Sequence, residues 1–131
     1  MKQYQTEFIK NLALLGHASS GKTTVADAMI FAAGGTDRIG KTAEGTTVMD
    51  YDAEEKKRGT SVVTSVYPIE WKDKKINLLD APGLFDFASG VREALTAAES
   101  ALIVLSGKSG LTVGAEQCYE LAREQGKATA F

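Results

Sequence analysis

The feature that most constrains this chain is a glycine-rich segment close to its N-terminus. Residues 16–23 read Gly-His-Ala-Ser-Ser-Gly-Lys-Thr and fit the pattern G-x-x-x-x-G-K-[ST]. Two glycines let the backbone curl so that successive N–H groups point inward, toward phosphate oxygens. Lys22 adds a positive charge for the β- and γ-phosphates, and the Thr23 hydroxyl can ligate Mg²⁺. A helix that begins near Lys22 would direct its positive dipole end at the same anion.

Short apolar runs precede this segment and recur further along the chain. They cover residues 9–16, 76–81 and 101–106, and such bounded runs are typical of strands buried on both faces of a parallel sheet. Stretches with helical spacing lie between them. Their apolar stripes comprise Val25, Ala26, Met29, Ile30 and Ala33, then Val91, Leu95 and Ala98, then Ala115, Cys118 and Ala122. Alternating strands and helices predict a three-layer α/β domain with right-handed crossovers.

One pair of predicted strands has no room for a helix between its members. Residues 62–71 are rich in β-formers, and a charged turn at residues 72–74 leads directly into the run at 76–81. These two strands should therefore pair as an antiparallel hairpin. Pro68 lacks a backbone N–H, which places its strand at the edge of the sheet. We expect a mostly parallel sheet with one antiparallel edge strand.

A second candidate element follows the predicted strand at 76–81 and reads Asp80-Ala81-Pro82-Gly83. A carboxylate that emerges from a buried strand beside a phosphate loop is well placed to hold Mg²⁺ through water. Gly83 offers a backbone N–H that can approach a γ-phosphate with no side chain in the way. Together the two elements predict a bound nucleotide and Mg²⁺.

Composition excludes several classes of protein. The 131 residues suffice for one domain, and 44% hydrophobic with 24% charged residues exclude a disordered tail. Fifteen Lys and Arg against 17 Asp and Glu leave a net charge of −2, so nucleic-acid binding by this chain alone is not expected. No apolar run could cross a membrane, and residues 1–7 do not read as a secretory signal. We expect a cytoplasmic protein in which Cys118 is a core thiol.

Several motifs, in register along the chain, resemble one known family. They are Gly-His-x-x-x-Gly-Lys-Thr-Thr at residues 16–24; Glu44-Gly45, Met49-Asp50-Tyr51, Glu54, Glu55, Arg58 and Gly59; Trp71-Lys72-Asp73 with Ile76-Asn77; and Asp80-x-Pro82-Gly83 with Asp86-Phe87. Together they resemble the G domain of translational GTPases, above all elongation factor G and its paralogues. The resemblance covers residues 8–131 and implies the P-loop NTPase G-domain fold.

The resemblance also implies roles for individual residues. Residues 1–131 would be a partial G domain, with switch I at residues 34–61 and switch II at residues 81–89, both ordered by a γ-phosphate. GTP or GDP would be the ligand and the ribosome a partner. The implied nucleotide-binding residues are Gly16, His17, Ala18, Ser19, Ser20, Gly21, Lys22, Thr23, Thr24, Asp80 and Gly83; the implied Mg²⁺ ligands are Thr23, Ser61 and Asp80.

Three positions depart from the family pattern. Ser61 stands where the family has a Mg²⁺-ligating threonine, and Ser19 stands where the family has an aspartate in its phosphate loop. Leu84 occupies the place of the histidine that positions the attacking water. Because leucine has no hydrogen-bond donor or acceptor, it cannot orient water in this way. No catalytic residue is therefore assigned.

Two alternatives stay open at the level of sequence. Leu84 favours a nucleotide-sensing switch with weak or no intrinsic hydrolysis over an active GTPase. The family's guanine-selecting Asn-Lys-x-Asp motif would follow Phe131, so no residue present reads a base and an ATP-using protein is the weaker alternative. Because the sequence stops within a predicted strand and before that motif, we expect it to be a fragment of a longer protein.

Overall fold

A computed structural model describes residues 2–49, 63–83 and 88–131 of the chain. These residues form one five-stranded sheet with the strand order β2-β3-β1-β4-β5. The strands are β1 (Ile9–Leu15), β2 (Ser65–Trp71), β3 (Lys74–Asp80), β4 (Ser100–Ile103) and β5 (Ala128–Ala130). The helices are α1 (Lys22–Ala32), α3 (Ala88–Ala97) and α4 (Val113–Glu124), with 3-10 turns at η1 (Thr6–Phe8) and η2 (Thr42–Glu44). No helix among the described residues is long and apolar enough to cross a membrane.

The pairing of the strands confirms the predicted mixed sheet. Strand β1 lies parallel to both β3 and β4, and β4 lies parallel to β5. Strand β2 pairs antiparallel with β3 at the edge of the sheet, with Pro68 opposite Asn77. The turn between them places Lys72 and Asp73 at φ 47° and 59°, which closes the hairpin in two residues. Strand β2 begins at Ser65, and Val62 lies outside the described residues.

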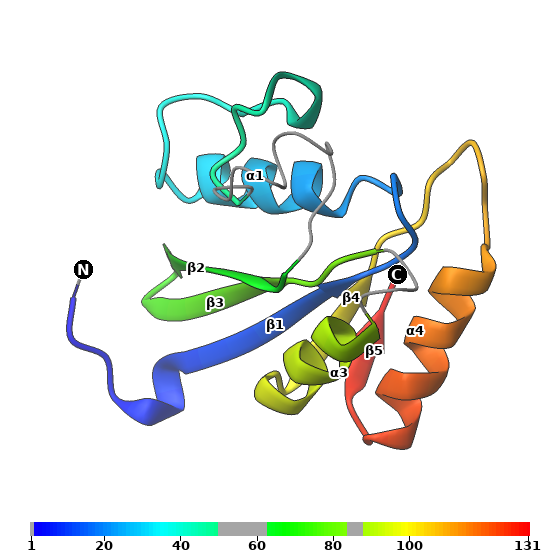
Figure 1. The fold of residues 1–131 in the computed structure, drawn as a ribbon. Coiled ribbons are helices and arrows are strands. Elements are labelled where there is room, and N and C mark those ends of the chain that lie inside the picture. The colour runs from blue at the N-terminus through cyan, green and yellow to red at the C-terminus, as the bar shows by residue number, and fades with distance from the viewer. Residues whose placement is uncertain (1, 50–62, 84–87) are drawn as a thin grey trace.

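The predicted three layers are present, because helices cover both faces of the sheet (Figure 1). Helix α1 lies over one face, where Ala26 and Ile30 pack with Leu14 and Leu78 in one buried cluster. Helices α3 and α4 lie over the other face. Their predicted stripes are buried there in a second cluster that includes Val91, Leu95, Ala98, Ala115, Cys118 and Ala122.

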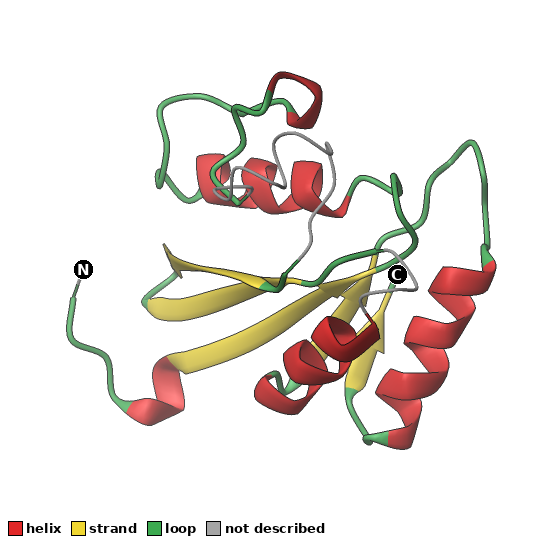
Figure 2. Ribbon diagram, viewed as in Figure 1, coloured by secondary structure: helices red, strands yellow, loops and turns green. Residues whose placement is uncertain are grey.

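The connections that leave the carboxyl ends of the parallel strands β1, β3 and β4 meet along one edge of the sheet (Figure 2). The loop of residues 16–21 follows β1, and residues 81–83 follow β3. The apolar run at 101–106 gives a shorter strand than its length predicts. Strand β4 ends at Ile103, although Val104 N still donates to Leu15 O at 2.8 Å. A loop of residues 104–112 then leads to α4, so three loops surround the end of β1.

Candidate functional site

The loop between β1 and α1 has the left-handed backbone that its glycines predict. Gly16, Ser19 and Gly21 have φ values of 146°, 62° and 97°. At Gly16 an added Cβ would lie 2.5 Å from Val104 O and 2.9 Å from Ser20 Oγ, so only glycine fits. Alternation of left- and right-handed residues turns successive N–H groups to one side and makes a concavity for an anion.

Lys22 is the first residue of α1 and is buried, with 6% of its surface exposed. Its Nζ donates to His17 O at 3.3 Å, so the ammonium lies across the loop that precedes it. The N-cap residue, Gly21, offers no side chain to the helix, and the N–H groups of the first turn face the loop. The loop, the ammonium and the helix dipole therefore converge on one place.

Thr23 and Asp80 come from different elements and meet beside this loop. Thr23 Oγ1 donates to Asp80 Oδ2 at 2.7 Å, and Asp80 is only 1% exposed at the end of β3. A hydroxyl and a carboxylate are hard oxygen donors, and Mg²⁺ usually takes one or two such protein ligands with water and substrate phosphates. The donor set thus fits Mg²⁺. Among the described residues no group of three or more His, Cys, Asp or Glu side chains forms a metal cluster.

Gly83 lies directly against the same loop. An added Cβ there would collide with Lys22 Nζ and lie 2.8 Å from Ala18 N. The segment after β3 therefore approaches the lysine and the loop backbone at a position that only glycine tolerates, in agreement with the close approach that the sequence predicts. Lys22, Thr23, Asp80 and Gly83 are brought together within one small volume.

The remaining candidates of the loop have different surroundings. The carbonyl of His17 accepts from Ser20 N at 3.2 Å, while its ring lies against α4, where an added Cβ on Gly114 would collide with Nδ1. Ser19 and Thr24 are exposed, and Ala18 is half-buried. Ser20 Oγ is buried and has no hydrogen-bond partner among the described residues.

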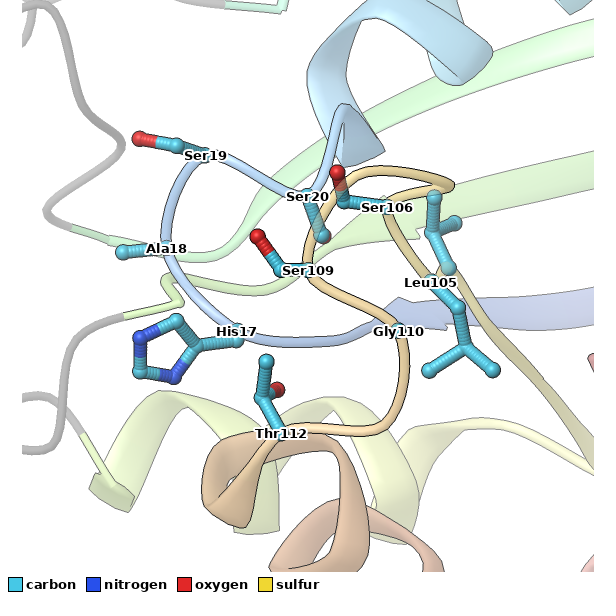
Figure 3. A pocket seen from close by; sticks show the side chains of 10 residues that line it. His17, Ala18, Ser19, Ser20, Leu105, Ser106, Ser109, Gly110 and Thr112 are labelled. Carbon is cyan, nitrogen blue, oxygen red and sulfur yellow. The ribbon is translucent and has the colours of Figure 1, made fainter.

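Sequence reasoning missed the loop of residues 104–112 as a wall of this site. Figure 3 shows the loop that carries Ser106, Ser109, Gly110 and Thr112 beside the loop that carries His17–Ser20. Residues of both loops line a cavity of about 60 Å³. The carbonyl of Ser106 accepts from Gly110 N at 2.8 Å, which folds this loop back on itself. Its position after a parallel strand adjacent to β1 was the available signal, since such loops gather at the same sheet edge.

Two sets of candidates lie outside the described residues. Ser61 and most of the charged part of predicted switch I fall in residues 50–62, and Leu84 falls in residues 84–87. The structure describes residues 34–49 of predicted switch I, and residues 81–83 and 88–89 of predicted switch II.

Cys118 is buried beneath the phosphate loop, as its place on an apolar stripe predicts. Burial raises the pKa of its thiol, although a hydrogen bond with the Gly16 backbone and the charge of Lys22 act in the opposite direction. A neutral, buried thiol is a packing group rather than a nucleophile.

A family model of the elongation factor Tu GTP binding domain matches residues 7–131, which is nearly the whole chain. The chain belongs to this family. The match agrees with the site, because the residues gathered at the sheet edge are those of a phosphate-binding loop and its partner carboxylate. The predicted G-domain fold and the predicted resemblance to translational GTPases are both confirmed.

Two curated proteins are similar to the chain over most of its length. It is 41% identical over 103 residues to ribosome-releasing factor 2, mitochondrial, of Drosophila grimshawi, and 38% identical over 110 residues to that of Drosophila melanogaster. These matches cover 79% and 84% of the chain but only 14% and 15% of the two relatives. The chain thus corresponds to a small part of the length of the curated relatives that it matches.

Two solved structures support the fold. The crystal structure of ttk003000868 from Thermus thermophilus superposes with a TM-score of 0.88 at 42% identity, covering 92% of this chain and 18% of that one. The bacterial selenocysteine-specific elongation factor EF-Sec superposes with a TM-score of 0.68 at 24% identity, covering 87% of this chain and 17% of that one. The second likeness concerns the fold alone.

Proposed function

We propose that this GTP-binding domain serves a factor G-like protein that couples GTP binding and hydrolysis to a step on the ribosome. The observation that carries the proposal is the contact between Thr23 and Asp80 at 2.7 Å beside the buried Lys22. The relatives named ribosome-releasing factor 2 support the ribosomal part of the proposal.

The roles of the residues follow from their chemistry. Lys22 neutralises the β- and γ-phosphates, and the backbone N–H groups of residues 16–24 hold phosphate oxygens. Ser20 Oγ has no partner among the described residues and can donate to a phosphate oxygen. Gly83 lets its own N–H reach a γ-phosphate, since its Cα already lies close to Lys22.

Mg²⁺, when bound, neutralises the charge that develops on the transferred phosphoryl group. Thr23 would ligate it directly and Asp80 through water, with Ser61 as a further ligand that the family resemblance assigns. Residues 34–61 and 81–89 would act as switches I and II. We propose a cytoplasmic location for the protein. The names of the two curated relatives quoted above include the word mitochondrial.

Leu84 supports a second candidate, a nucleotide-sensing switch with weak intrinsic hydrolysis. Catalysis by this family consists of positioning and charge stabilisation, so a side chain that cannot hold water removes one contribution while leaving nucleotide binding intact. The two candidates share one site and differ only in the rate of the chemical step.

Multiple-turnover GTP hydrolysis separates the two candidates. It is measured with and without ribosomes on the native protein isolated from its source. A GTPase of the proposed kind is stimulated by ribosomes, whereas the absence of stimulation would leave only the nucleotide-sensing switch.

Single-turnover rates of Leu84→His and Leu84→Ala variants test whether Leu84 limits the rate of hydrolysis. If Leu84 limits hydrolysis, the histidine variant is faster than the parent by about tenfold or more, and the alanine variant is not. Equal rates in the parent and both variants would show that Leu84 does not limit hydrolysis.

A further inference from the structure

Strand β2 begins with a buried hydroxyl that the proposed mechanism does not use. Ser65 is the first residue of β2 and is 2% exposed. Side chains alternate between the two faces of a strand, and Tyr67 and Ile69 of β2 pack in the core cluster under α1. Ser65 therefore lies on the face of the sheet that α1 covers, where the pattern of β2 would otherwise place an apolar side chain.

Ser65 is the neighbour of the carboxylate that the proposed function assigns to Mg²⁺. It is paired with Asp80 in the antiparallel ladder of β2 and β3. Residues opposite each other in such a ladder point to the same face, with Cβ atoms about 5 Å apart. Thr23 Oγ1 reaches Asp80 Oδ2 from α1, so this is also the face that the Asp80 side chain uses. Ser65, Asp80 and Thr23 thus bring three oxygen groups to one side of the sheet.

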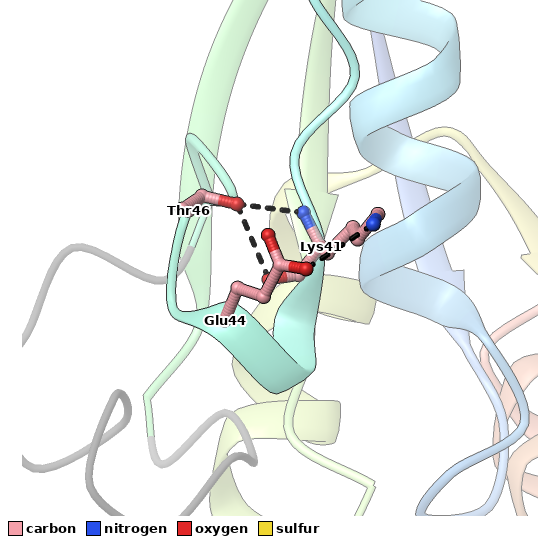
Figure 4. A network of polar contacts seen from close by, with 3 residues as sticks. All are labelled: Lys41, Glu44 and Thr46. Carbon is pink, nitrogen blue, oxygen red and sulfur yellow. Dashed lines mark hydrogen bonds and ion pairs between the residues drawn. The ribbon is translucent and has the colours of Figure 1, made fainter.

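Two other polar side chains near α1 obtain their hydrogen bonds from the protein. The buried carboxylate of Asp27 accepts from Gly40 N at 2.6 Å and from Val48 N at 2.9 Å. In the loop beside α1, Thr46 Oγ1 accepts from Lys41 N at 2.9 Å (Figure 4). The hydroxyl of Ser65 differs from both, because it is buried and has no hydrogen-bond partner among the described residues.

A buried hydroxyl of this kind calls for a partner from outside the protein. Burial of a hydroxyl is costly unless it is hydrogen-bonded, and buried polar groups that lack a protein partner usually bond to ordered water. In the proposed function, Asp80 reaches Mg²⁺ through water. A metal-bound water donates both of its hydrogens and so needs two acceptors. A carboxylate and a serine hydroxyl can each supply one.

We propose that Ser65 is a positioning residue for Mg²⁺, and that its hydroxyl accepts from the metal-bound water that Asp80 also holds. The inference rests on the proposed function, since it needs the Asp80 site to hold Mg²⁺ beside a nucleotide. Loss of an outer-shell partner typically lowers metal affinity by about tenfold or more. A neutral hydroxyl holds water less strongly than a carboxylate does, so we expect an effect of about threefold or more.

The test is the Mg²⁺ dependence of binding of a non-hydrolysable GTP analogue to the full-length protein, by calorimetry over a series of Mg²⁺ concentrations and in EDTA. Ser65→Ala removes the hydroxyl. Ser65→Cys keeps the size of the side chain and replaces the hydroxyl by a weakly bonding thiol, which repeats the test if the alanine variant does not fold. Tyr67→Phe is the matched control, because it removes a hydroxyl from the same face of β2. That hydroxyl donates to Gly35 O at 3.4 Å, and Tyr67 pairs with Leu78 rather than with Asp80.

The Mg²⁺ concentration for half-maximal stimulation of binding should rise about threefold or more in both Ser65 variants, while the Kd in EDTA changes by less than about twofold. Tyr67→Phe should match the parent. Combined with Asp80→Asn, Ser65→Ala should add less than its effect alone, because both changes act on one water.

Three results would overturn the inference. They are an unchanged Mg²⁺ requirement in both Ser65 variants, an equal loss of affinity with Mg²⁺ and in EDTA, and full additivity with Asp80→Asn. If Asp80→Asn itself leaves the Mg²⁺ requirement unchanged, the proposed Mg²⁺ site fails first and the inference falls with it.

Discussion

Polar side chains gather at both ends of the parallel strands, and the two groups differ in how they use their hydrogen bonds. Near the amino ends, Asn11 donates to Glu99 from its backbone N at 2.6 Å and from its side chain at 3.1 Å. Asn77 Nδ2 in turn donates to Asn11 Oδ1 at 2.7 Å, and Glu99 N donates to Asn11 O at 3.2 Å. In this network the polar groups bond to one another, and they tie β1 and β3 to Glu99, the residue that precedes β4.

At the carboxyl ends the polar groups surround a place for a ligand. Lys22 is buried against a loop of backbone N–H groups, and Thr23 and Asp80 present two hard oxygen ligands beside it. Gly16 and Gly83 stand where an added side chain would collide with atoms of this site or its walls. The difference shows that polarity at a strand end does not make a site: backbone curvature, a helix N-terminus and room for the ligand do.

The largest expected effect is a loss of nucleotide affinity when a charge is removed from the site at the carboxyl ends. Lys22→Ala should weaken binding of GDP and GTP by about thirtyfold or more, because about 2–5 kcal/mol depends on a desolvated charge pair of this kind. Lys75→Ala, on the neighbouring strand β3, removes the same charge at a distance from the loop and should leave binding unchanged. Isothermal titration calorimetry on both variants makes the measurement. Equal affinities would place the nucleotide elsewhere.

A smaller effect at the same end concerns Mg²⁺. Asp80→Asn keeps the shape of the side chain and removes its charge, so the stimulation of GTP binding by Mg²⁺ should fall by about tenfold. Titration of Mg²⁺ at fixed nucleotide measures it. If the variant needs no more Mg²⁺ than the parent does, Asp80 has no part in holding the ion.

The smallest effect belongs to the amino ends. Burial raises the pKa of Glu99, but the hydrogen bonds from Asn11 outweigh it and hold that pKa below its usual range. The stability that Glu99 adds is therefore present above about pH 4.3 and is lost as the pH falls through the lowered pKa. Since the carboxylate is exposed, Glu99→Gln should cost about 1 kcal/mol or less.

Urea unfolding at pH 7 and at pH 3 measures that contribution, with Glu93→Gln, on the exposed surface of α3, as the control. The difference between the parent and Glu99→Gln should shrink at pH 3, and nucleotide affinity at pH 7 should match that of the parent. A loss of nucleotide affinity in Glu99→Gln would mean that the two ends of the sheet are coupled. That result would contradict the view that only the carboxyl ends form a ligand site.

The sequence predicted most where the signal was local. The phosphate loop, the hairpin at β2 and β3 and the apolar stripes of α1, α3 and α4 each follow from patterns within a few residues. Asp80 and Gly83 were predicted because they end a strand that had to lie beside β1. The structure confirms that these two residues lie against the loop.

The sequence predicted little where the partners of a residue come from parts of the chain that are distant in sequence. Asp27 interrupts the apolar stripe between Ala26 and Ile30, and a buried acid there was a signal, but nothing in the pattern named the two amides that it accepts from. The loop of residues 104–112 was missed for the same reason. Its serines face the phosphate loop because the strands are adjacent in the sheet, not in the chain.

We propose that the nucleotide binds at the carboxyl ends of the parallel strands, on the loop between β1 and α1. Amide hydrogen exchange, followed peptide by peptide with and without GDP and Mg²⁺, tests it most directly. We expect added protection in residues 16–24 and 80–83, and no change in residues 9–12 and 98–101 near the Glu99 network. Protection near Glu99, with none in the loop of Lys22, would contradict it.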